Sequence, residues 1–434
     1  MYHSDSRGYS TAMPTPAQIL LFCLRPTLGR WLWWRYRVTV HRHGPARAFR
    51  PPLLVLSNHV NFWDPFLIAF TFDQPVHFLA ADGNFRGRGM RLLMAAAGAI
   101  PKAKARTDME SLRLLRARIA ERQIVALFPE GQRTWDGTTR PMLPATPKLA
   151  RLLGAPVVMV QLRGAYLSKP RWARGIRRGR VEIHLIPLVS RAELGHFSRG
   201  ELASKISEAL AWDDVAWAQR RGVRFIGRNR AEHAEQALWY CPRCEGWGTL
   251  RSIGDELVCS ECGHTTRMVT TGGLSHGAGA AGFPVSRSHS PAPATVAAWN
   301  ALQHAALERE ISAAATGGAL PYQIPAMDYA TGYRSRPLQS RGPVAVELGY
   351  ESLALISEAG GLSLRKPLPL GMPLSAVSIP VAHIRGIHVQ YATQLEFYHG
   401  GTLHVLRSRR PQDSVMRLED TVLALQELYK SSKH

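Results

Sequence analysis

Residues 53–64 read LLVLSNHVNFWD, and residues 124–133 read IVALFPEGQR. Each stretch begins with a short apolar run of the kind that forms a buried strand, and each then turns polar. From residue 53 to about residue 215, further apolar runs alternate with segments of helical periodicity. Strands that are separated in this way by helices indicate an α/β domain.

The 434-residue chain is long enough for two to four domains, and its positive charge is concentrated in the first half. Residues 1–240 contain 37 Lys and Arg against 17 Asp and Glu, whereas residues 241–434 contain 17 against 15. The first half is therefore expected to meet a polyanion: nucleic acid, an anionic membrane surface or a phosphorylated substrate. With 45% apolar and 20% charged residues, the composition excludes a wholly disordered chain.

His59 is followed five residues later by Asp64, where the first strand gives way to a helix. The chain can fold back there so that the carboxylate reaches the imidazole ring. The Asp would hold one ring nitrogen protonated and leave the other to act as a base. The chain has 17 His, so a chance match is common, and a helix-capping Asp beside an ordinary surface His is the alternative.

Three more elements accompany this pair. After the second strand, Gly131 permits a tight turn, and Arg133 offers a planar fork for a phosphate. Residues 98–106 form a basic loop after an apolar helix, and residues 155–160 form an apolar Pro-Val strand. The candidate cations of the loop are Lys102, Lys104 and Arg106.

In chain order, the four elements are Asn-His-four-residues-Asp, the basic loop, Phe-Pro-Glu-Gly-x-Arg and the Pro-Val strand. This order resembles that of the glycerolipid acyltransferases, and most closely the 1-acyl-sn-glycerol-3-phosphate acyltransferases, over roughly residues 17–215. The resemblance implies a glycerol-3-phosphate-acyltransferase-like α/β sandwich and no catalytic cofactor. It also implies an acyl donor, either acyl-CoA or acyl carrier protein, and a lysophosphatidic acid-like acceptor whose free hydroxyl receives the acyl group, giving phosphatidic acid. Both substrates are anionic, which suits the basic half of the chain.

The resemblance also implies roles for individual residues. His59 would be the general base, and Asp64 would orient it. Glu130, Gly131 and Arg133 would bind the glycerol phosphate of the acceptor, and a cation of the basic loop, best matched by Lys104, would assist. Gln132 stands where the family often has Thr or Ser, and lysines stand where its loop commonly has Arg. Another lysophospholipid or a glycolipid is therefore the alternative acceptor.

Two cysteine pairs, separated by fourteen residues, occur later in the chain: Cys241, Cys244, Cys259 and Cys262. Four thiolates with this spacing predict a tetrahedral structural zinc site without an open coordination position, resembling a zinc ribbon. Zinc ribbons often bind nucleic acid, which makes a non-catalytic nucleic-acid-binding scaffold the rival function. Residues 241–268 are nearly balanced in charge, however, so nucleic acid is not the expected partner.

The remaining sequence predicts a mostly-β domain near the C-terminus. Short strand-like runs over residues 344–410 precede an amphipathic helix over 412–430, an arrangement that resembles a pleckstrin-homology-like domain. The expected domains are N-terminal interfacial helices (1–52), an acyltransferase domain (53–240), a zinc ribbon (241–268), a linker (269–295) and a helix followed by the β domain (296–434).

The N-terminal segment favours peripheral membrane binding. Residues 17–40 mix apolar and aromatic side chains with four arginines, and Pro26 is expected to divide them into two short helices. A helix packed on the next domain is the alternative. The first residues do not form a signal peptide, and no apolar run reaches the length of a membrane span. We therefore expect a cytoplasmic protein bound to the inner face of the cell membrane.

Overall fold

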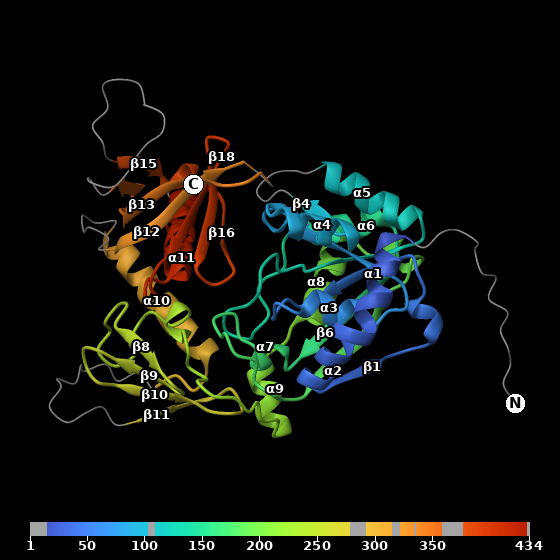
Figure 1. The fold of residues 1–434 in the computed structure, drawn as a ribbon, viewed down its shortest axis with the longest axis horizontal. Helices are drawn as coiled ribbons and strands as arrows, with labels where there is room; N and C mark the ends of the chain where they lie inside the picture. The colour runs from blue at the N-terminus through green and yellow to red at the C-terminus, as the bar shows by residue number, and fades with distance from the viewer. Residues whose placement is uncertain are drawn as a thin grey trace, which may run out of the picture.

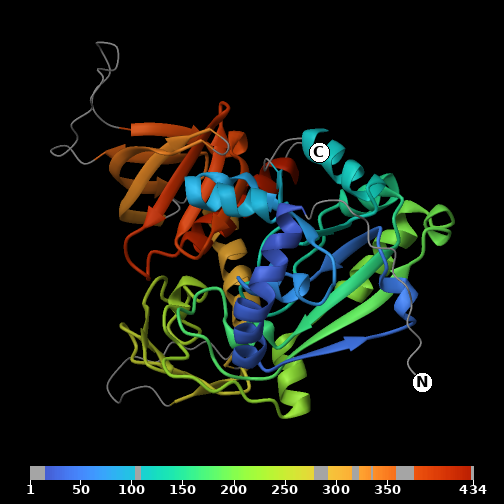
Figure 2. The same ribbon diagram turned by 45° about the vertical axis from the view of Figure 1, so that its right-hand side comes forward.

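The computed structural model describes residues 15–102, 109–277, 292–314, 322–333, 336–357 and 376–431. Figure 1 shows three parts: an α/β part coloured blue to green, a small cysteine-bearing part in yellow-green, and a C-terminal β domain in orange and red. The two later parts lie together on one side of the α/β part (Figures 1 and 2).

A seven-stranded sheet forms the centre of the α/β part. Its strands are ordered β1 (Val38–Arg42), β7 (Val181–Val189), β6 (Val157–Arg163), β2 (Leu53–Ser57), β5 (Ile124–Leu127), β3 (Val76–Ala81) and β4 (Ile100–Lys102). All neighbouring strands are parallel except β6 and β7. The predicted α/β class is confirmed.

Helices cover both faces of this sheet because its central strands are apolar on both sides. In β2, Leu53 and Val55 face one core, whereas Leu54 and Leu56 face the other. The first core is covered by α2 (Arg30–Tyr36), α3 (Asp64–Ala69), α7 (Ala165–Ser168) and α9 (Asp214–Arg221). The second is covered by α5 (Met109–Ala120), α6 (Thr146–Leu153) and α8 (Arg199–Leu210). Such two-sided burial is typical of sheets with parallel strands.

The N-terminal segment differs from its expected boundary. Helix α1 (Pro16–Leu24) continues into α2 through a π-helical turn, Arg25–Gly29, which begins with the residue before Pro26. The missing N–H of Pro26 interrupts the α-helical hydrogen-bond ladder here, which accounts for the π-helical turn between α1 and α2. Strand β1 pairs with β7, so residues 38–42 belong to the α/β sheet and not to the helical segment expected over residues 1–52.

The cysteine-bearing part is an antiparallel sheet of four short strands. It contains β8 (Leu250–Ile253), β9 (Glu256–Cys259), β10 (Thr265–Met268) and β11 (Leu274–His276). Because β11 pairs with β10, this sheet extends beyond residue 268, into the segment expected to be a linker. Residues 278–291 of that expected linker lie outside the described residues.

The C-terminal domain is a seven-stranded antiparallel sheet closed by a helix. The strands are ordered β15 (Ala376–Pro380), β14 (Ser352–Ser357), β13 (Gln339–Leu348), β12 (Tyr322–Gly332), β18 (Thr402–Ser408), β17 (Gln394–His399) and β16 (Arg385–Gln390). Helix α11 (Val415–Ser431) buries the predicted apolar stripe, including Val415, Leu418, Val422 and Leu425. The expected β-rich domain is confirmed, and its first strand begins earlier than residue 344.

Helix α10 (Val296–Ala314) links the three parts. Its Trp299 Nε1 donates to the carbonyl of Tyr240 at 2.8 Å, and its Asn300 donates to Asp136 at 2.9 Å. His304 pairs with Asp420 of α11 at 3.0 Å. Figure 2 shows α10 in gold between the cysteine-bearing part and the C-terminal domain. Among the described helices, including α4 (Arg88–Ala96), none combines the length and apolar composition needed to cross a bilayer.

Candidate active site

Strand order explains why two distant motifs meet. β2 and β5 are parallel neighbours in which Leu56 lies opposite Leu127, so the residues that follow both strands emerge at one edge of the sheet. His59 follows β2, and Glu130 follows β5, 71 residues later. The backbone N–H of His59 donates to Glu130 Oε1 at 2.7 Å, and the N–H of Thr134 donates to the His59 carbonyl at 2.9 Å.

His59 and Asp64 form a hydrogen-bonded pair. The His59 Nδ1 to Asp64 Oδ2 distance is 2.9 Å. The same oxygen accepts the backbone N–H groups of Val60 and Asn61 at 2.7 and 2.8 Å, which fixes the carboxylate at the start of α3. The Asp64 side chain is fully buried, whereas the His59 side chain is 20% exposed. The carboxylate can therefore orient an imidazole that a substrate can still reach.

Burial and hydrogen bonding act in opposite directions on the pKa of Asp64. Burial raises the pKa of Asp64 to about 8, while the N–H donors of Asn61 and Val60 and the charge of Arg133 lower it. The His59 ring also stacks on Phe128 with a centroid distance of 3.9 Å, which limits its rotation.

Glu130 and Gly131 build the turn beside this pair. The Glu130 carboxyl is buried; its Oε1 accepts from His59 and its Oε2 accepts from the N–H of Arg140 at 2.7 Å. Burial raises the pKa of Glu130 to about 8, against the opposing effect of these two donors. Gly131 has a φ of +71°, and a Cβ there would lie 3.0 Å from Leu143 Cδ1. The turn therefore needs glycine.

The structure describes only two of the four predicted phosphate-binding cations, Arg133 and Lys102. Arg133 lies near enough to Asp64 for their charges to interact, and its guanidinium donates to the Tyr391 carbonyl at 3.4 Å. Lys102 is half-buried at the end of β4. Lys104 and Arg106 lie outside the described residues. Sequence reasoning thus placed Arg133 beside the His59–Asp64 pair, but it did not foresee a partner from the C-terminal domain.

Two asparagines that flank His59 were missed at the sequence level. Asn58 exchanges two hydrogen bonds with the backbone of Leu162 in β6, at 2.8 and 2.9 Å. The Asn61 side chain donates to the Ala165 carbonyl at 2.8 Å. Both are buried and tie the loop after β2 to the end of β6. Their position directly after a predicted strand was the sequence feature that could have identified them.

Residues 171–180 contain five arginines, a pattern that by itself indicates a surface loop facing anionic lipid, an acidic carrier protein or solvent. Arg171 and Arg177 are instead buried. The Arg171 guanidinium lies 4.2 Å from the ring centre of Trp135 and donates to the carbonyls of Tyr391, Val389 and Arg133. Backbone carbonyls thus satisfy a cation that the sequence pattern placed at the surface.

The four cysteines converge. Cys241 Sγ lies 3.7 Å from Cys262 Sγ, Cys244 Sγ lies 3.6 Å from Cys259 Sγ, and all four sulfur atoms lie within 4.8 Å of one another. Sulfur atoms at about 2.3 Å from a tetrahedral zinc ion would be about 3.8 Å apart. The donor set and spacing fit a structural zinc site.

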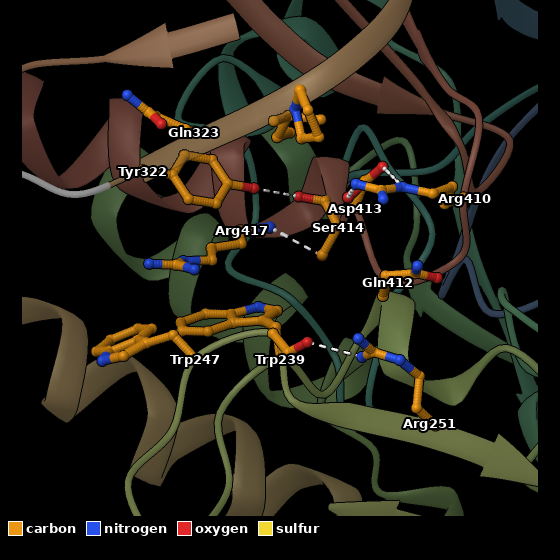
Figure 3. Close-up of a pocket in the computed structure, with 13 residues that line it drawn as sticks. Trp239, Trp247, Arg251, Tyr322, Gln323, Arg410, Gln412, Asp413, Ser414 and Arg417 are labelled. Atoms are coloured by element: carbon orange, nitrogen blue, oxygen red, sulfur yellow. Dashed lines mark hydrogen bonds and ion pairs between the residues drawn. The ribbon is translucent and has the colours of Figure 1, made fainter. Parts of the chain in front are cut away.

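A pocket of about 220 Å³ lies between the cysteine-bearing part and the C-terminal domain (Figure 3). Arg417 of α11 lies there between aromatic rings, 4.2 Å from the ring centre of Tyr322 and 4.5 Å from that of Trp247. Ser414 caps α11 by accepting the N–H of Arg417 at 3.1 Å. None of the acyltransferase-motif residues lines this pocket. Its cation–π contacts join α11 to the cysteine-bearing part.

Comparisons with known proteins agree on the first part of the chain. Residues 37–163 match the family model described as Acyltransferase. The chain is 23% identical over 167 residues to a 1-acyl-sn-glycerol-3-phosphate acyltransferase from Borreliella burgdorferi, a match that covers 36% of this chain and 64% of that protein. It is 27% identical over 164 residues to a chloroplastic 1-acyl-sn-glycerol-3-phosphate acyltransferase from Brassica napus, covering 37% of this chain and 46% of the relative.

The crystal structure of the acyltransferase PlsC from Thermotoga maritima matches with a TM-score of 0.39 and 19% identity, covering 47% of this chain and 81% of that chain. The chain spans less than two thirds of each of the two curated relatives. The family model matches the part of the chain that carries the His59–Asp64 pair and the turn at Arg133. The comparisons thus confirm, for this part of the chain, the resemblance to the glycerolipid acyltransferases that the sequence predicted.

Proposed function

We propose that this protein transfers a fatty acyl group from acyl-CoA or acyl carrier protein to the free hydroxyl of a lysophosphatidic acid-like acceptor, giving phosphatidic acid. The observation that carries the proposal is the partly exposed His59, held by a buried Asp64 at the sheet edge where Arg133 also lies. A base and a cation side by side suit an acceptor that carries both a hydroxyl and a phosphate.

The proposed reaction needs no group from outside the chain and its two substrates. His59 removes the proton of the acceptor hydroxyl as its oxygen attacks the thioester carbonyl. Asp64 accepts the Nδ1–H bond and stabilises the imidazolium that forms. Collapse of the tetrahedral intermediate breaks the carbon–sulfur bond, and the leaving thiolate takes the proton from His59. The products are the diacyl lipid and the free thiol.

Within this mechanism, Glu130 positions the loop of His59 and does not contact the substrate. Both of its oxygens accept backbone N–H groups, from His59 and from Arg140. We therefore propose that Glu130 joins the two motif loops, and that Arg133 rather than Glu130 contacts the acceptor phosphate. This changes the role that the family resemblance implied for Glu130.

Acyl transfer by the purified chain tests the proposed function. Labelled acyl-CoA and acyl carrier protein would each be offered with lysophosphatidic acid, lysophosphatidylglycerol, lysophosphatidylcholine and a glycolipid. We expect transfer to lysophosphatidic acid to be fastest. Transfer only to another acceptor would keep the mechanism and replace the substrate, whereas no transfer by folded protein to any acceptor would reject the enzyme activity.

We also propose that the four cysteines hold one structural zinc ion, as in a zinc ribbon. The close approach of their sulfur atoms supports this, because four clustered thiols are otherwise weak hydrogen-bonding partners.

The C-terminal domain is proposed to be pleckstrin-homology-like. Its single antiparallel sheet of strands β12 to β18 and its closing helix α11 support this assignment.

Cys244→Ser should release the zinc and lower the thermal midpoint of unfolding, since metal binding contributes directly to the stability of such sites. We expect kcat to stay within about twofold of wild type, because the cysteines lie outside the site at His59. Zinc content and thermal unfolding measure the first effect, and acyl transfer measures the second. Cys23→Ser, a change of the exposed cysteine, is the matched control. Full zinc content in Cys244→Ser would contradict the ligand assignment.

Peripheral binding to an anionic membrane, on the inner face of the cell membrane, is proposed from the N-terminal helices. Helix α1 lies beside α4, and both expose large apolar side chains: Phe22 is 81% exposed and Leu92 is 71% exposed. Trp34 is also exposed, among several arginines. Apolar side chains beside cations are typical of helices that lie in a membrane interface.

Phe22→Asp should weaken binding to vesicles that contain anionic lipid by about tenfold or more. The change removes an apolar side chain whose burial stabilises by about 1.5–3 kcal/mol, and it adds a like charge to the surface. Vesicle co-sedimentation measures the effect. Ile253→Asp, at an apolar position of the cysteine-bearing part that is 65% exposed, should bind as wild type. Equal vesicle binding by both variants would show that α1 does not contribute to membrane binding.

A further inference from the structure

Three cations gather on the acyltransferase part where the C-terminal domain meets it: Arg133, Lys169 and Arg171. The Arg171 guanidinium donates to the Arg133 carbonyl at 3.0 Å. The Lys169 backbone N–H donates at 3.3 Å to the Ala165 carbonyl, which also accepts the Asn61 side chain from the loop of His59. Burial lowers the pKa of each cation, and the charge of Arg133 further lowers the pKa of Lys169 and of Arg171. In the part of the chain that the structure describes, no ion pair joins any of the three to a carboxylate. Arg171 is buried, whereas Arg133 and Lys169 are partly exposed, so an anion can reach these two cations.

The carboxylates whose charges reach this cluster are poor substitutes for that anion. Asp64 acts on Arg133 but is engaged with His59. Glu419 and Asp420 of α11 act on Arg171, yet burial raises the pKa of Glu419, and Asp420 pairs with His304. The cluster therefore keeps an excess of positive charge beside the catalytic pair.

The turn between β16 and β17 covers this cluster. The Tyr391 carbonyl accepts from Arg171 Nε at 2.9 Å and from Arg133 at 3.4 Å. Tyr391 has a φ of +59°, a left-handed conformation that costs a non-glycine residue energy and is kept where surrounding contacts impose it. The Arg171 guanidinium donates hydrogen bonds to three backbone carbonyls. Arg171 therefore positions the turn and does not bind the ligand.

Side-chain contacts hold the hairpin and the neighbouring helix α11 against the acyltransferase part. Arg86, next to the 3₁₀ turn Asp82–Phe85, forms a two-pronged ion pair with Glu396 of β17, at 2.5 and 2.7 Å. Both side chains are largely buried, so the pair is shielded from solvent. Gln390 at the end of β16 donates to Asn84 at 3.2 Å, and Gln132 beside Arg133 donates to Glu419 of α11 at 2.8 Å.

We propose that the β16–β17 hairpin is the roof of the acceptor's anion site, and that Lys169 binds the phosphate there together with Arg133. The inference rests on the proposed function and names the site that gives it an anionic acceptor. A dianionic phosphate is a stronger acceptor than the neutral Tyr391 carbonyl, which sits at a long distance from Arg133, so it can take the Arg133 fork. Lys169 adds a second charge, and the roof lies over Arg133 through the Tyr391 carbonyl.

Binding of glycerol 3-phosphate, measured by titration calorimetry, tests the site without turnover. We expect Lys169→Gln to weaken binding about tenfold, because one of two cations is lost. Glu396→Gln, which removes the charge that holds the hairpin to Arg86, should weaken it about fivefold. In acyl transfer, both variants should raise KM for lysophosphatidic acid by similar factors and leave kcat within about twofold.

Two matched controls separate the site from general effects of charge. Lys148→Gln removes an exposed lysine of α6, and Asp328→Asn removes an exposed ion pair, with Arg409, from the same β domain. Both should bind glycerol 3-phosphate as wild type does. If Glu396→Gln does not fold, Gln390→Ala loosens the same hairpin through its contact with Asn84 and should weaken binding about twofold.

The outcomes distinguish the inference from the proposed function. Unchanged glycerol 3-phosphate binding in Lys169→Gln would overturn the role of Lys169, and unchanged binding in the folded hairpin variants would overturn the roof, even if acyl transfer proceeds. Wild-type binding that depends on both positions, without acyl transfer, would uphold the anion site and reject the function. Inorganic phosphate serves as a second probe: binding it as tightly as glycerol 3-phosphate would show that the site recognises the phosphate alone.

Discussion

His59→Ala lowers kcat/KM for acyl transfer by about three orders of magnitude, with little change in the affinity for the acceptor, if His59 is the general base. General-base catalysis contributes about 10²–10⁴-fold, and the neighbouring carboxylates cannot replace the imidazole. Asp64 is fully buried and already accepts three hydrogen bonds at one oxygen. Glu130 has both oxygens engaged with backbone N–H groups.

The measurement needs a folded variant and a control for the loss of an imidazole. The His59 side chain is partly exposed and its backbone carries the contacts to Glu130 and Thr134, so alanine should leave the fold intact. Circular dichroism and thermal unfolding check this. His196→Ala removes a histidine from the loop before α8 and should keep wild-type activity. Retention of most of the turnover in His59→Ala would reject the base assignment.

Arg133→Gln has the second-largest expected effect: kcat/KM for lysophosphatidic acid should fall by about thirtyfold, mainly through KM. A hydrogen bond to a charged group contributes about 2 kcal/mol, and about 1.4 kcal/mol corresponds to a factor of ten. The loss should be largest for lysophosphatidic acid, whose phosphate monoester has the highest charge, and smaller for lysophosphatidylcholine. Steady-state kinetics with both acceptors measure the difference.

Arg133→Lys and Arg174→Gln complete the series. Lysine keeps the charge but not the planar fork, so Arg133→Lys should recover part of the lost affinity. Arg174 is an exposed arginine of the same basic region, and its replacement should leave KM unchanged. An equal loss for every acceptor, or an equal loss in Arg174→Gln, would mean that Arg133 acts through general charge and does not bind the phosphate.

The sequence alone determined those features that depend on neighbouring residues. The alternation of apolar runs and helical periodicity was sufficient for the α/β class, because burial on both faces demands that pattern. The His59–Asp64 contact was predictable because only four residues separate the two, and a strand-to-helix turn brings them together. The four cysteines were predictable for the same reason, since each pair lies on one short turn and the two pairs lie close in the chain.

Tertiary structure decided everything that depends on which surfaces dock. Strand neighbours are not encoded in any one strand, so β1 joined the sheet and β11 extended the cysteine-bearing part against the expected boundaries. The contacts of Arg171 with Tyr391 and of Arg86 with Glu396 join residues 220 and 310 positions apart. No local pattern marks such pairs, because each arginine is satisfied only when two separately folded surfaces meet.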